Sequence, residues 1–243
     1  MVRRLSRTLN ASRKAVEALA AHHGLPRSSE QSLWALVEAL EREPDPPTAL
    51  RSAAEVVDGH LADSLSGLEV PELARAGRVA DVGAGAGFPG LALAAAMPEA
   101  QVDLIESNMR KCAVIDRLAG AARLQGARSV PERAEEWAAG EGAGAYDAVT
   151  ARALAPLAVL AEYAAPLLGP GGVLVAWKGA RDPEEEAAGR RAAERLGLHP
   201  QVVLRVEPFP HARDRHLHVL SKVLPTPAGF PRRVGVARKR PLA

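Results

Sequence analysis

The stretch VADVGAGAGFPG at residues 79–90 decides the fold class of this 243-residue chain. An apolar run leads into glycines at three alternate positions, and Phe-Pro-Gly then opens an alanine-rich stretch with helical character. Glycine suits such a turn because the backbone reverses sharply and can approach a ligand with no Cβ in the way. Proline near the first helical turn costs little, since its missing N–H would have no partner there. The pattern predicts a strand, a turn that holds a ligand, and a helix.

Short apolar runs alternate with helical stretches beyond this turn. The expected strands are 78–83, 101–106, 127–130, 146–151 and 172–178, and the expected helices are 90–96, 109–124, 133–138, 157–168 and 184–196. This alternation predicts a parallel sheet covered by helices on both faces. Two last strand-like runs, 202–209 and 216–223, are joined by a short loop and predict an antiparallel hairpin. We therefore expect an α/β, Rossmann-like fold with a mostly parallel seven-stranded sheet that ends in an antiparallel hairpin.

Two cofactors compete for the glycine turn. Residues 85–90 match G-x-G-x-x-G, the fingerprint of nicotinamide dinucleotide-binding domains, but a lone match is weak. Asp81 precedes the first glycine by two residues, where its carboxylate can face the amino and sulfonium groups of S-adenosylmethionine. Glu106 ends the second strand and can accept hydrogen bonds from two ribose hydroxyls of either cofactor. Because a terminal hairpin is typical of methyltransferase sheets, we expect S-adenosylmethionine, with a nicotinamide-dependent oxidoreductase as the alternative.

The first 66 residues show helical patterning without a strand. Candidate helices lie at 13–22, 32–43 and 49–66, and a cluster of prolines ends the second. We expect three regions, which are an N-terminal helical extension at 1–66, a methyltransferase domain at 67–224 and a basic C-terminal tail at 225–243.

Seven short motifs occur in a characteristic order along the chain. They are HLADS at 60–64, DVGAGAGFPG at 81–90, LIES at 104–107, RAEEW at 133–137, TARALAPL at 150–157, AWKG at 176–179 and DRHLHVL at 214–220. Together they resemble the RsmG (GidB) family of bacterial small-subunit rRNA guanine-N7 methyltransferases. The resemblance covers about residue 59 to the C-terminus, and the short, proline-broken region before it departs from the family pattern.

The resemblance implies transfer of a methyl group from S-adenosylmethionine to N7 of a guanine in 16S rRNA, either free or in a small-subunit assembly particle. It also implies the cofactor contacts, which are Gly83 and Phe88 for the methionine moiety, Gly85 in the turn itself, Glu106, Ser107 and Asn108 for the ribose, Ala134 and Glu135 for the adenine, and Arg152 to close the site.

The chain lacks groups that other base methylations need. Residues 151–154 read Ala-Arg-Ala-Leu, without the acid or amide, two prolines and aromatic of exocyclic-amine enzymes. Cys112, the one thiol, falls early on a helix, where we expect a buried side chain and no nucleophile. Guanine N7 needs no base, because its lone pair is free at neutral pH, so positioning drives the reaction. A cation beside guanine O6 would orient the base, and the candidates are Arg133, Arg152 and Lys178. No metal site is expected.

Positive charge gathers at the C-terminal end. Residues 209–243 hold eight Lys/Arg and one acid, so their net charge is +7. Because the whole chain has a net charge of +2, the other 208 residues sum to −5. This asymmetry indicates contact with a polyanion, and the expected RNA contacts are Arg215, His216, Arg232, Arg233, Arg238, Lys239 and Arg240. On this interpretation, deletion of 231–243 leaves folding nearly intact and weakens RNA binding. The alternative is a structural strap that packs on the sheet.

Composition places the chain among globular proteins, with 47% apolar and 25% charged residues. No apolar run approaches the roughly 18 residues of a membrane span, and no secretory signal is expected. We expect a monomeric, cytoplasmic enzyme. A non-catalytic RNA- or cofactor-binding module on the same fold is the alternative from another class, and the intact turn, Glu106 and Arg152 argue against it.

Overall fold

A seven-stranded sheet forms the centre of the computed structural model, which describes residues 2–50 and 52–242. Its strands are β1 (Arg78–Val82), β2 (Gln101–Ile105), β3 (Ala127–Val130), β4 (Tyr146–Arg152), β5 (Leu168–Lys178), β6 (Leu198–Arg205) and β7 (His216–Lys222). Their order is β3-β2-β1-β4-β5-β7-β6. Strands β1 to β5 are parallel, and β7 is antiparallel to both β5 and β6. The predicted parallel sheet with a terminal antiparallel hairpin is confirmed.

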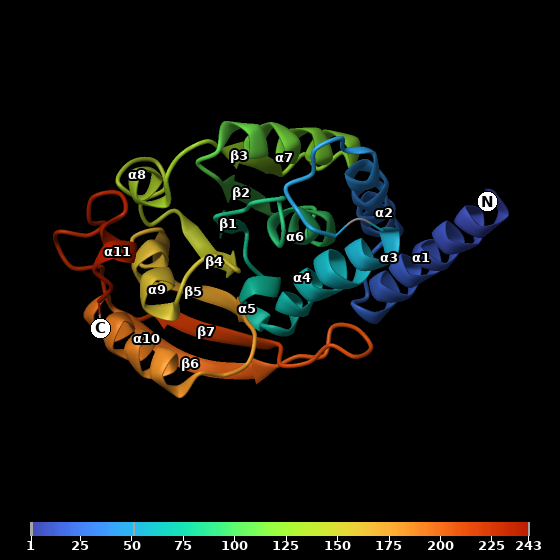
Figure 1. Cartoon of the computed structure of the whole chain (residues 1–243). Coiled ribbons are helices and arrows are strands. Elements are labelled where there is room, and N and C mark those ends of the chain that lie inside the picture. The colour runs from blue at the N-terminus through green and yellow to red at the C-terminus, as the bar shows by residue number, and fades with distance from the viewer. Residues whose placement is uncertain (1, 51, 243) are drawn as a thin grey trace.

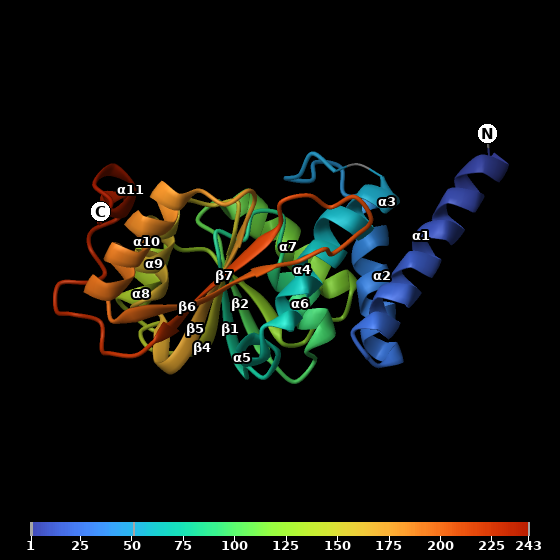
Figure 2. The same ribbon diagram turned by 90° about the horizontal axis from the view of Figure 1, so that it is seen from below.

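Helices cover both faces of this sheet, as Figures 1 and 2 show. The first face carries α6 (Gly90–Ala96) and α7 (Met109–Ala121), and the second carries α8 (Ala134–Ala138), α9 (Leu157–Ala164) and α10 (Pro183–Arg195). The N-terminal helices pack on the first face and are α1 (Val2–His22), α2 (Arg27–Arg42), α3 (Ala53–Val56), the π-helix η1 (Val57–Ala62), α4 (Asp63–Leu65), the 3₁₀ turn η2 (Ser66–Glu69) and α5 (Pro71–Ala74). The C-terminal segment with α11 (Val236–Lys239) lies against α9 on the second face.

Alternation of side chains along the strands produces two hydrophobic cores. In β1, Val79 packs into the core of the first face, whereas Ala80 and Val82 pack into the core of the second. The first core also contains residues of α2, such as Leu36, so the N-terminal helices share it with the sheet. The second core includes Leu242 near the C-terminus. The α2 helix and the C-terminal segment around Leu242 are therefore both built into the fold.

Several predicted elements have other bounds in the structure: the helix expected at 13–22 spans Val2–His22, the helix expected at 157–168 ends at Ala164, and the strand expected at 172–178 begins at Leu168. Two further differences have a physical reason. Strand β6 spans Leu198–Arg205 instead of 202–209, because Pro200 is tolerated in an edge strand that pairs only with β7. The hairpin loop at 206–215 is consequently longer than expected. The predicted helix at 49–66 is helical from Ala53 onward, but residues 57–62 form a π-helix, whose wider turn the apolar pattern does not reveal. Within the described residues, no helix is both long and apolar enough to span a membrane.

Candidate active site

The glycine turn between β1 and α6 adopts backbone angles that suit glycine. Gly83, Gly85 and Gly87 have φ of +69°, +60° and +96°, in the left-handed region that other residues rarely adopt. A Cβ on Gly83 would also lie 2.5 Å from Cδ1 of Leu154. A Cβ on Gly85 would meet only a backbone oxygen at 3.8 Å. Leu154 thus fills the space beside Gly83, whereas Gly85 leaves an open, Cβ-free backbone surface where the sequence predicts a ligand.

Asp81 organises this turn from behind, which corrects the prediction that it faces the cofactor. The residue is only 1% exposed. Its Oδ2 accepts the Gly90 N–H at 2.8 Å, and its Oδ1 accepts the Thr150 hydroxyl at 3.0 Å. Both carboxylate oxygens thus bond within the protein, and Asp81 acts by joining β1 and β4 to the start of α6.

Burial raises the pKa of Asp81 to about 6 from 3.8, although the hydrogen bonds from Gly90 and Thr150 favour the charged form. The folded protein therefore holds this proton more tightly, and the associated stability is present below pH 4 and is lost as the pH rises through 6. Between pH 4 and 7, the free energy of unfolding of the wild type should fall by about 2.4 kcal/mol relative to Asp81→Asn. Urea unfolding of both ligand-free proteins at four pH values measures this difference, and parallel pH profiles would contradict the prediction.

A cavity of about 440 Å³ opens where the glycine turn meets the carboxyl ends of β1, β2 and β4. Nine residues predicted for the site line it, which are Gly83, Gly85, Phe88, Glu106, Ser107, Arg133, Ala134, Glu135 and Arg152. The predicted residues Asn108 and Lys178 lie outside its lining. Ligands of open α/β sheets bind at this edge, where the strand order changes direction between β1 and β4. The cavity has the position and volume of a cofactor site.

Glu106 is held in place at the wall of this cavity. Its Oε2 accepts the Gly85 N–H at 3.1 Å, and its Oε1 accepts the Asn108 N–H at 2.9 Å. Each oxygen keeps a second lone pair for a ligand hydroxyl. The side chain of Asn108 is used differently from the prediction, because its Oδ1 caps α7 by accepting the backbone N–H groups of residues 110 and 111. Cys112 is buried and donates to the Glu106 carbonyl, so the predicted structural role of this thiol is confirmed.

Glu106→Ala should weaken cofactor binding by roughly 1.5–3 kcal/mol, because the substitution removes the acceptor for two ribose hydroxyls. It also leaves two turn N–H groups without their partner. Calorimetric titration with S-adenosylhomocysteine measures the change. Asp116→Ala, an exposed carboxylate on α7 outside the cavity lining, is the matched control and should bind as the wild type does. Equal dissociation constants for Glu106→Ala and the wild type would show that the ribose lies elsewhere.

An ion pair whose atoms lack hydrogen bonds lies in the lining of the cavity. The Nε of Arg133 and the Oε2 of Glu135 are buried, lie 3.8 Å apart, and have no hydrogen-bond partner within the described chain. Buried polar groups usually have hydrogen-bond partners, so these two atoms, which contact each other only as an ion pair, can form hydrogen bonds with a polar ligand. Adenine carries both donors and acceptors and fits this position. The predicted cofactor residues therefore suit S-adenosylmethionine at both the ribose and the adenine ends.

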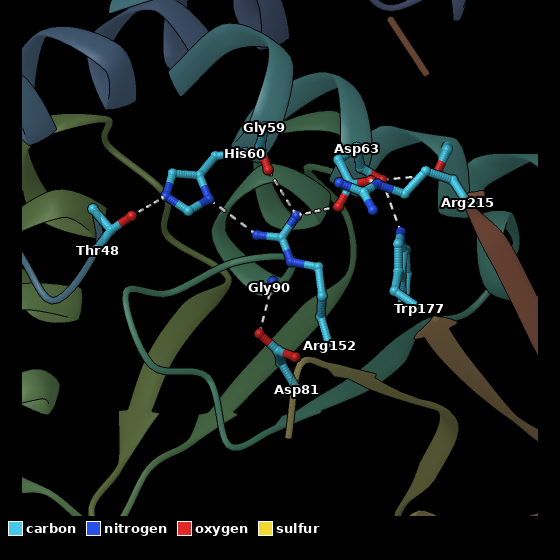
Figure 3. A network of polar contacts seen from close by, with 10 residues as sticks. Thr48, Gly59, His60, Asp63, Asp81, Gly90, Arg152, Trp177 and Arg215 are labelled. Atoms are coloured by element: carbon cyan, nitrogen blue, oxygen red, sulfur yellow. Dashed lines mark hydrogen bonds and ion pairs between the residues drawn. The ribbon is translucent and has the colours of Figure 1, made fainter. Parts of the chain in front are cut away.

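Arg152 closes the other end of the cavity through a network of polar contacts (Figure 3). Its Nη1 donates to Oδ2 of Asp63 at 2.6 Å and to the Gly59 carbonyl at 3.1 Å, and its Nη2 donates to Nδ1 of His60 at 3.0 Å. Because arginine only donates, Nδ1 of His60 is the acceptor, and the proton on Nε2 points to Thr48 Oγ1 at 2.9 Å. Burial, followed by the charge of Arg152, lowers the pKa of His60 to about 3. His60 is therefore a neutral, fully engaged ring at physiological pH.

Sequence reasoning missed the functional part of the N-terminal helices. His60 lines the cofactor cavity and stacks on Phe88 with ring centroids 4.4 Å apart. Asp63 is Arg152's ion-pair partner. The spacing of three residues between His60 and Asp63 puts both on one helical face, which is the signal that points to a shared role.

The other predicted cations lie beside a second cavity. Lys178 and Arg215 line this second cavity, which adjoins the first at Arg152. Lys178 forms an ion pair with Glu185 at 2.6 Å, and Nδ1 of His216 lies 2.9 Å from the Gly179 carbonyl. The structure thus separates the three predicted catalytic cations. Arg133 lines the first cavity, Arg152 lines both cavities, and Lys178 lines the second.

The C-terminal segment packs on the fold, as expected for the structural strap that the sequence left open as the alternative to an RNA-binding tail. Nε of Arg232 donates to Oε1 of Glu162 at 2.6 Å, and Glu162 is 3% exposed. The Gly235 N–H donates to Glu135 at 2.9 Å. Arg238, which lines the first cavity, donates to the Leu154 carbonyl at 2.9 Å. Arg232 therefore faces the protein and not RNA. Arg233, Lys239 and Arg240 have exposed side chains.

Solved methyltransferases share this fold. Fibrillarin from Aeropyrum pernix, crystallised with natively bound S-adenosyl-L-methionine, matches with a TM-score of 0.52 and 17% identity over 65% of this chain and 72% of its own. A predicted O-methyltransferase from Agrobacterium tumefaciens matches with a TM-score of 0.51 and 22% identity over 68% and 80% of the two chains. At these identities the likeness shows the fold alone. Fold and site together define an S-adenosylmethionine-dependent methyltransferase, and the nicotinamide alternative is not favoured.

Sequence relatives give the family. The model of the GidB family, described as rRNA small subunit methyltransferase G, matches residues 47–217. Ribosomal RNA small subunit methyltransferase G of Deinococcus radiodurans is 42% identical over 199 residues, covering 80% of this chain and 78% of its own. The protein of the same name from Lacticaseibacillus paracasei is 36% identical over 237 residues, covering 93% and 96%. The chain belongs to the rRNA small subunit methyltransferase G family, which confirms the resemblance of its motifs.

Proposed function

We propose that this chain transfers a methyl group from S-adenosylmethionine to N7 of a guanine in 16S rRNA, free or within a small-subunit assembly particle. The observation that carries the proposal is the junction of two cavities at Arg152, at the carboxyl ends of β4 and β5. One cavity fits the cofactor, and the other supplies a cationic wall for a base that presents acceptors at O6 and N7.

The junction offers cations, and the histidine that borders it is not free to act as a base, which favours N7 as the acceptor. His60 borders both cavities, but its two ring nitrogens are engaged by Arg152 and Thr48, so it cannot remove a proton. The bound cofactor supplies an electrophilic methyl group on its sulfonium. The chain's own contribution is to hold the base in line with that group through donors fixed by the network of Arg152.

The test is transfer of tritium from labelled S-adenosylmethionine to small-subunit RNA or to assembling particles, followed by analysis of the nucleosides. We expect label in 7-methylguanosine alone. RNA with 7-deazaguanosine at the target position, which lacks the N7 lone pair, should accept no methyl group. Label in another nucleoside would reject the proposal. Comparing the methylation rate of free RNA with that of assembling particles decides which of the two is the substrate.

RNA phosphates would meet the exposed cations of the strap and hairpin. Arg233 and Lys239 are exposed on the strap, and Arg215 lies in the hairpin loop. Replacing Arg233 and Lys239 with alanine should flatten the slope of log affinity against log salt by about 0.7–0.9 for each phosphate that is no longer neutralised. RNA affinity at three salt concentrations measures this slope, and an unchanged slope would place the RNA elsewhere. We also propose that the protein acts as a monomer and in the cytoplasm.

A further inference from the structure

The second cavity has the size and position of a binding site for the target base. It measures about 630 Å³, within the range of small-ligand pockets, and it shares His60 and Arg152 with the cofactor cavity. Its cationic groups are Arg152, Lys178 and Arg215, and its one acidic lining residue is Asp63. A lone carboxylate among cations in a pocket calls for a specific explanation.

Asp63 has one oxygen that accepts a hydrogen bond and one that is held only by an ion pair with Arg215 (Figure 3). The residue is 6% exposed, and its Oδ2 receives the hydrogen bond from Arg152. Its Oδ1 is buried without a hydrogen-bond partner in the described part of the chain. Oδ1 forms an ion pair with Nε of Arg215 at 3.4 Å, but neither of these two atoms has a hydrogen bond in the described part of the chain. A buried carboxylate oxygen without a hydrogen bond is costly even beside a cation, so a ligand that donates to it would gain affinity.

Arg215 covers this oxygen but is not fixed in the core. Its side chain is 43% exposed, and it ends the hairpin loop at 206–215 immediately before β7. A shift of this side chain would uncover Oδ1 of Asp63 without disturbing buried apolar contacts. The Arg152–Asp63 pair, at 2.6 Å, would stay in place and fix the direction of the carboxylate.

We infer that Asp63 reads the target guanine by accepting hydrogen bonds from its N1–H and N2 amino groups. This inference rests on the proposed function. Guanine presents N1–H and the N2 amino group as adjacent donors, with O6 next and N7 beyond it. Arg152 keeps two of its five N–H groups outside the hydrogen bonds described for this chain, and these suit O6. Because Arg152 also borders the cofactor cavity, this orientation turns N7 toward the methyl donor.

The same contact excludes adenine. Adenine has a lone pair at N1 where guanine has a hydrogen, so its N1 would face the Asp63 carboxylate with like charge density and no hydrogen bond. Pockets built to pair with a polar group reject analogues that lack it, because the pocket's own group is then left unpaired. Asp63 would therefore be a specificity-determining residue, distinct from the cations that orient O6.

The experiment compares guanosine with inosine at the target position of small-subunit RNA prepared by splinted ligation. Inosine keeps N1–H, O6 and N7 but lacks the N2 amino group. The wild-type enzyme should methylate guanosine roughly 10- to 100-fold more efficiently in kcat/KM, as expected for one hydrogen bond to a charged acceptor. Asp63→Asn should reduce this preference to about threefold or less. Glu43→Gln, which alters another arginine-paired carboxylate outside both cavities, should keep the full preference.

Two outcomes would overturn the inference. Equal wild-type activity on guanosine and inosine would show that the N2 amino group is not read, and this arm needs no variant to fold. If Asp63→Asn lowers kcat/KM by the same factor on guanosine RNA and on inosine RNA, Asp63 only positions Arg152. Binding of S-adenosylhomocysteine verifies that the variant retains its cofactor site. Absence of 7-methylguanosine from the wild-type reaction would reject the proposed function itself, which is a different result from the disappearance of a preference.

Discussion

Arg232→Ala is expected to lower the free energy of unfolding by about 3–5 kcal/mol. Arg232 is the ion-pair partner of Glu162, a carboxylate on α9 that is 3% exposed. Removing the arginine leaves a buried charge without a partner, which is the costly way to break such a pair. Nη2 of Arg232 also donates to the Arg240 carbonyl at 2.9 Å, so the end of the strap loses its anchor as well. Urea unfolding of the two proteins measures the difference.

The neighbouring residue provides a close control. Arg233 carries the same charge one position along, but its side chain is exposed, so Arg233→Ala should change stability by no more than about 0.5 kcal/mol. The double variant Arg232→Met with Glu162→Leu removes both charges and should recover most of the stability, because apolar replacement of a buried pair is often neutral. Equal stability of Arg232→Ala and Arg233→Ala would mean that the strap is not docked in solution.

The docked strap also shows why composition could not place the tail. Residues 232–240 carry five positive charges and no acid, which by itself indicates a phosphate-binding arm. The partner that contradicts this interpretation for Arg232 is Glu162, 70 residues earlier on a helix whose other side chains are apolar. Only the three-dimensional fold brings these two residues together. We therefore expect deletion of residues 231–243 to lower the stability of the fold, contrary to the expectation from the sequence.

The sheet, in contrast, could be predicted because its signals are local. Strand length, glycine at positive φ and the alternation of strands with helices are properties of neighbouring residues, and they gave the order of elements and the terminal hairpin. The shift of β6 toward Leu198 depends on its being an edge strand, which tolerates Pro200. Edge position follows from the whole sheet and is not visible in the segment.

Local hydrogen bonding also explains why some residues that the sequence predicted for the cofactor site do not line the cavity. Asp81 and Asn108 both have short polar side chains next to a helix start, and both bond to backbone N–H groups there. Glu106 bonds to nearby N–H groups as well, yet its carboxylate stays on the cavity wall. His60 and Asp63 were not predicted because their contact with Arg152 spans about 90 residues.

Arg152→Lys is expected to reduce kcat by about 10²- to 10³-fold, the effect of losing a preorganised donor at a reacting centre. Lysine keeps the charge, but one ammonium cannot bond to the Gly59 carbonyl, Asp63 and His60 while also presenting donors to a base. The planar guanidinium does this because its five N–H groups point in fixed directions. The rate is measured at saturating S-adenosylmethionine and RNA, so that weaker binding of either does not mimic slower chemistry.

The matched control for this substitution is Arg117→Lys, which alters an arginine that bonds to both carboxylate oxygens of Glu43 away from both cavities. Its kcat should stay within about twofold of the wild type, since exposed ion pairs contribute little. The affinity for S-adenosylhomocysteine then separates two roles of Arg152. A residue that orients the base loses kcat while cofactor affinity changes little. A residue that merely walls the cofactor cavity loses affinity and keeps kcat at saturation, and that result would remove Arg152 from the reacting centre.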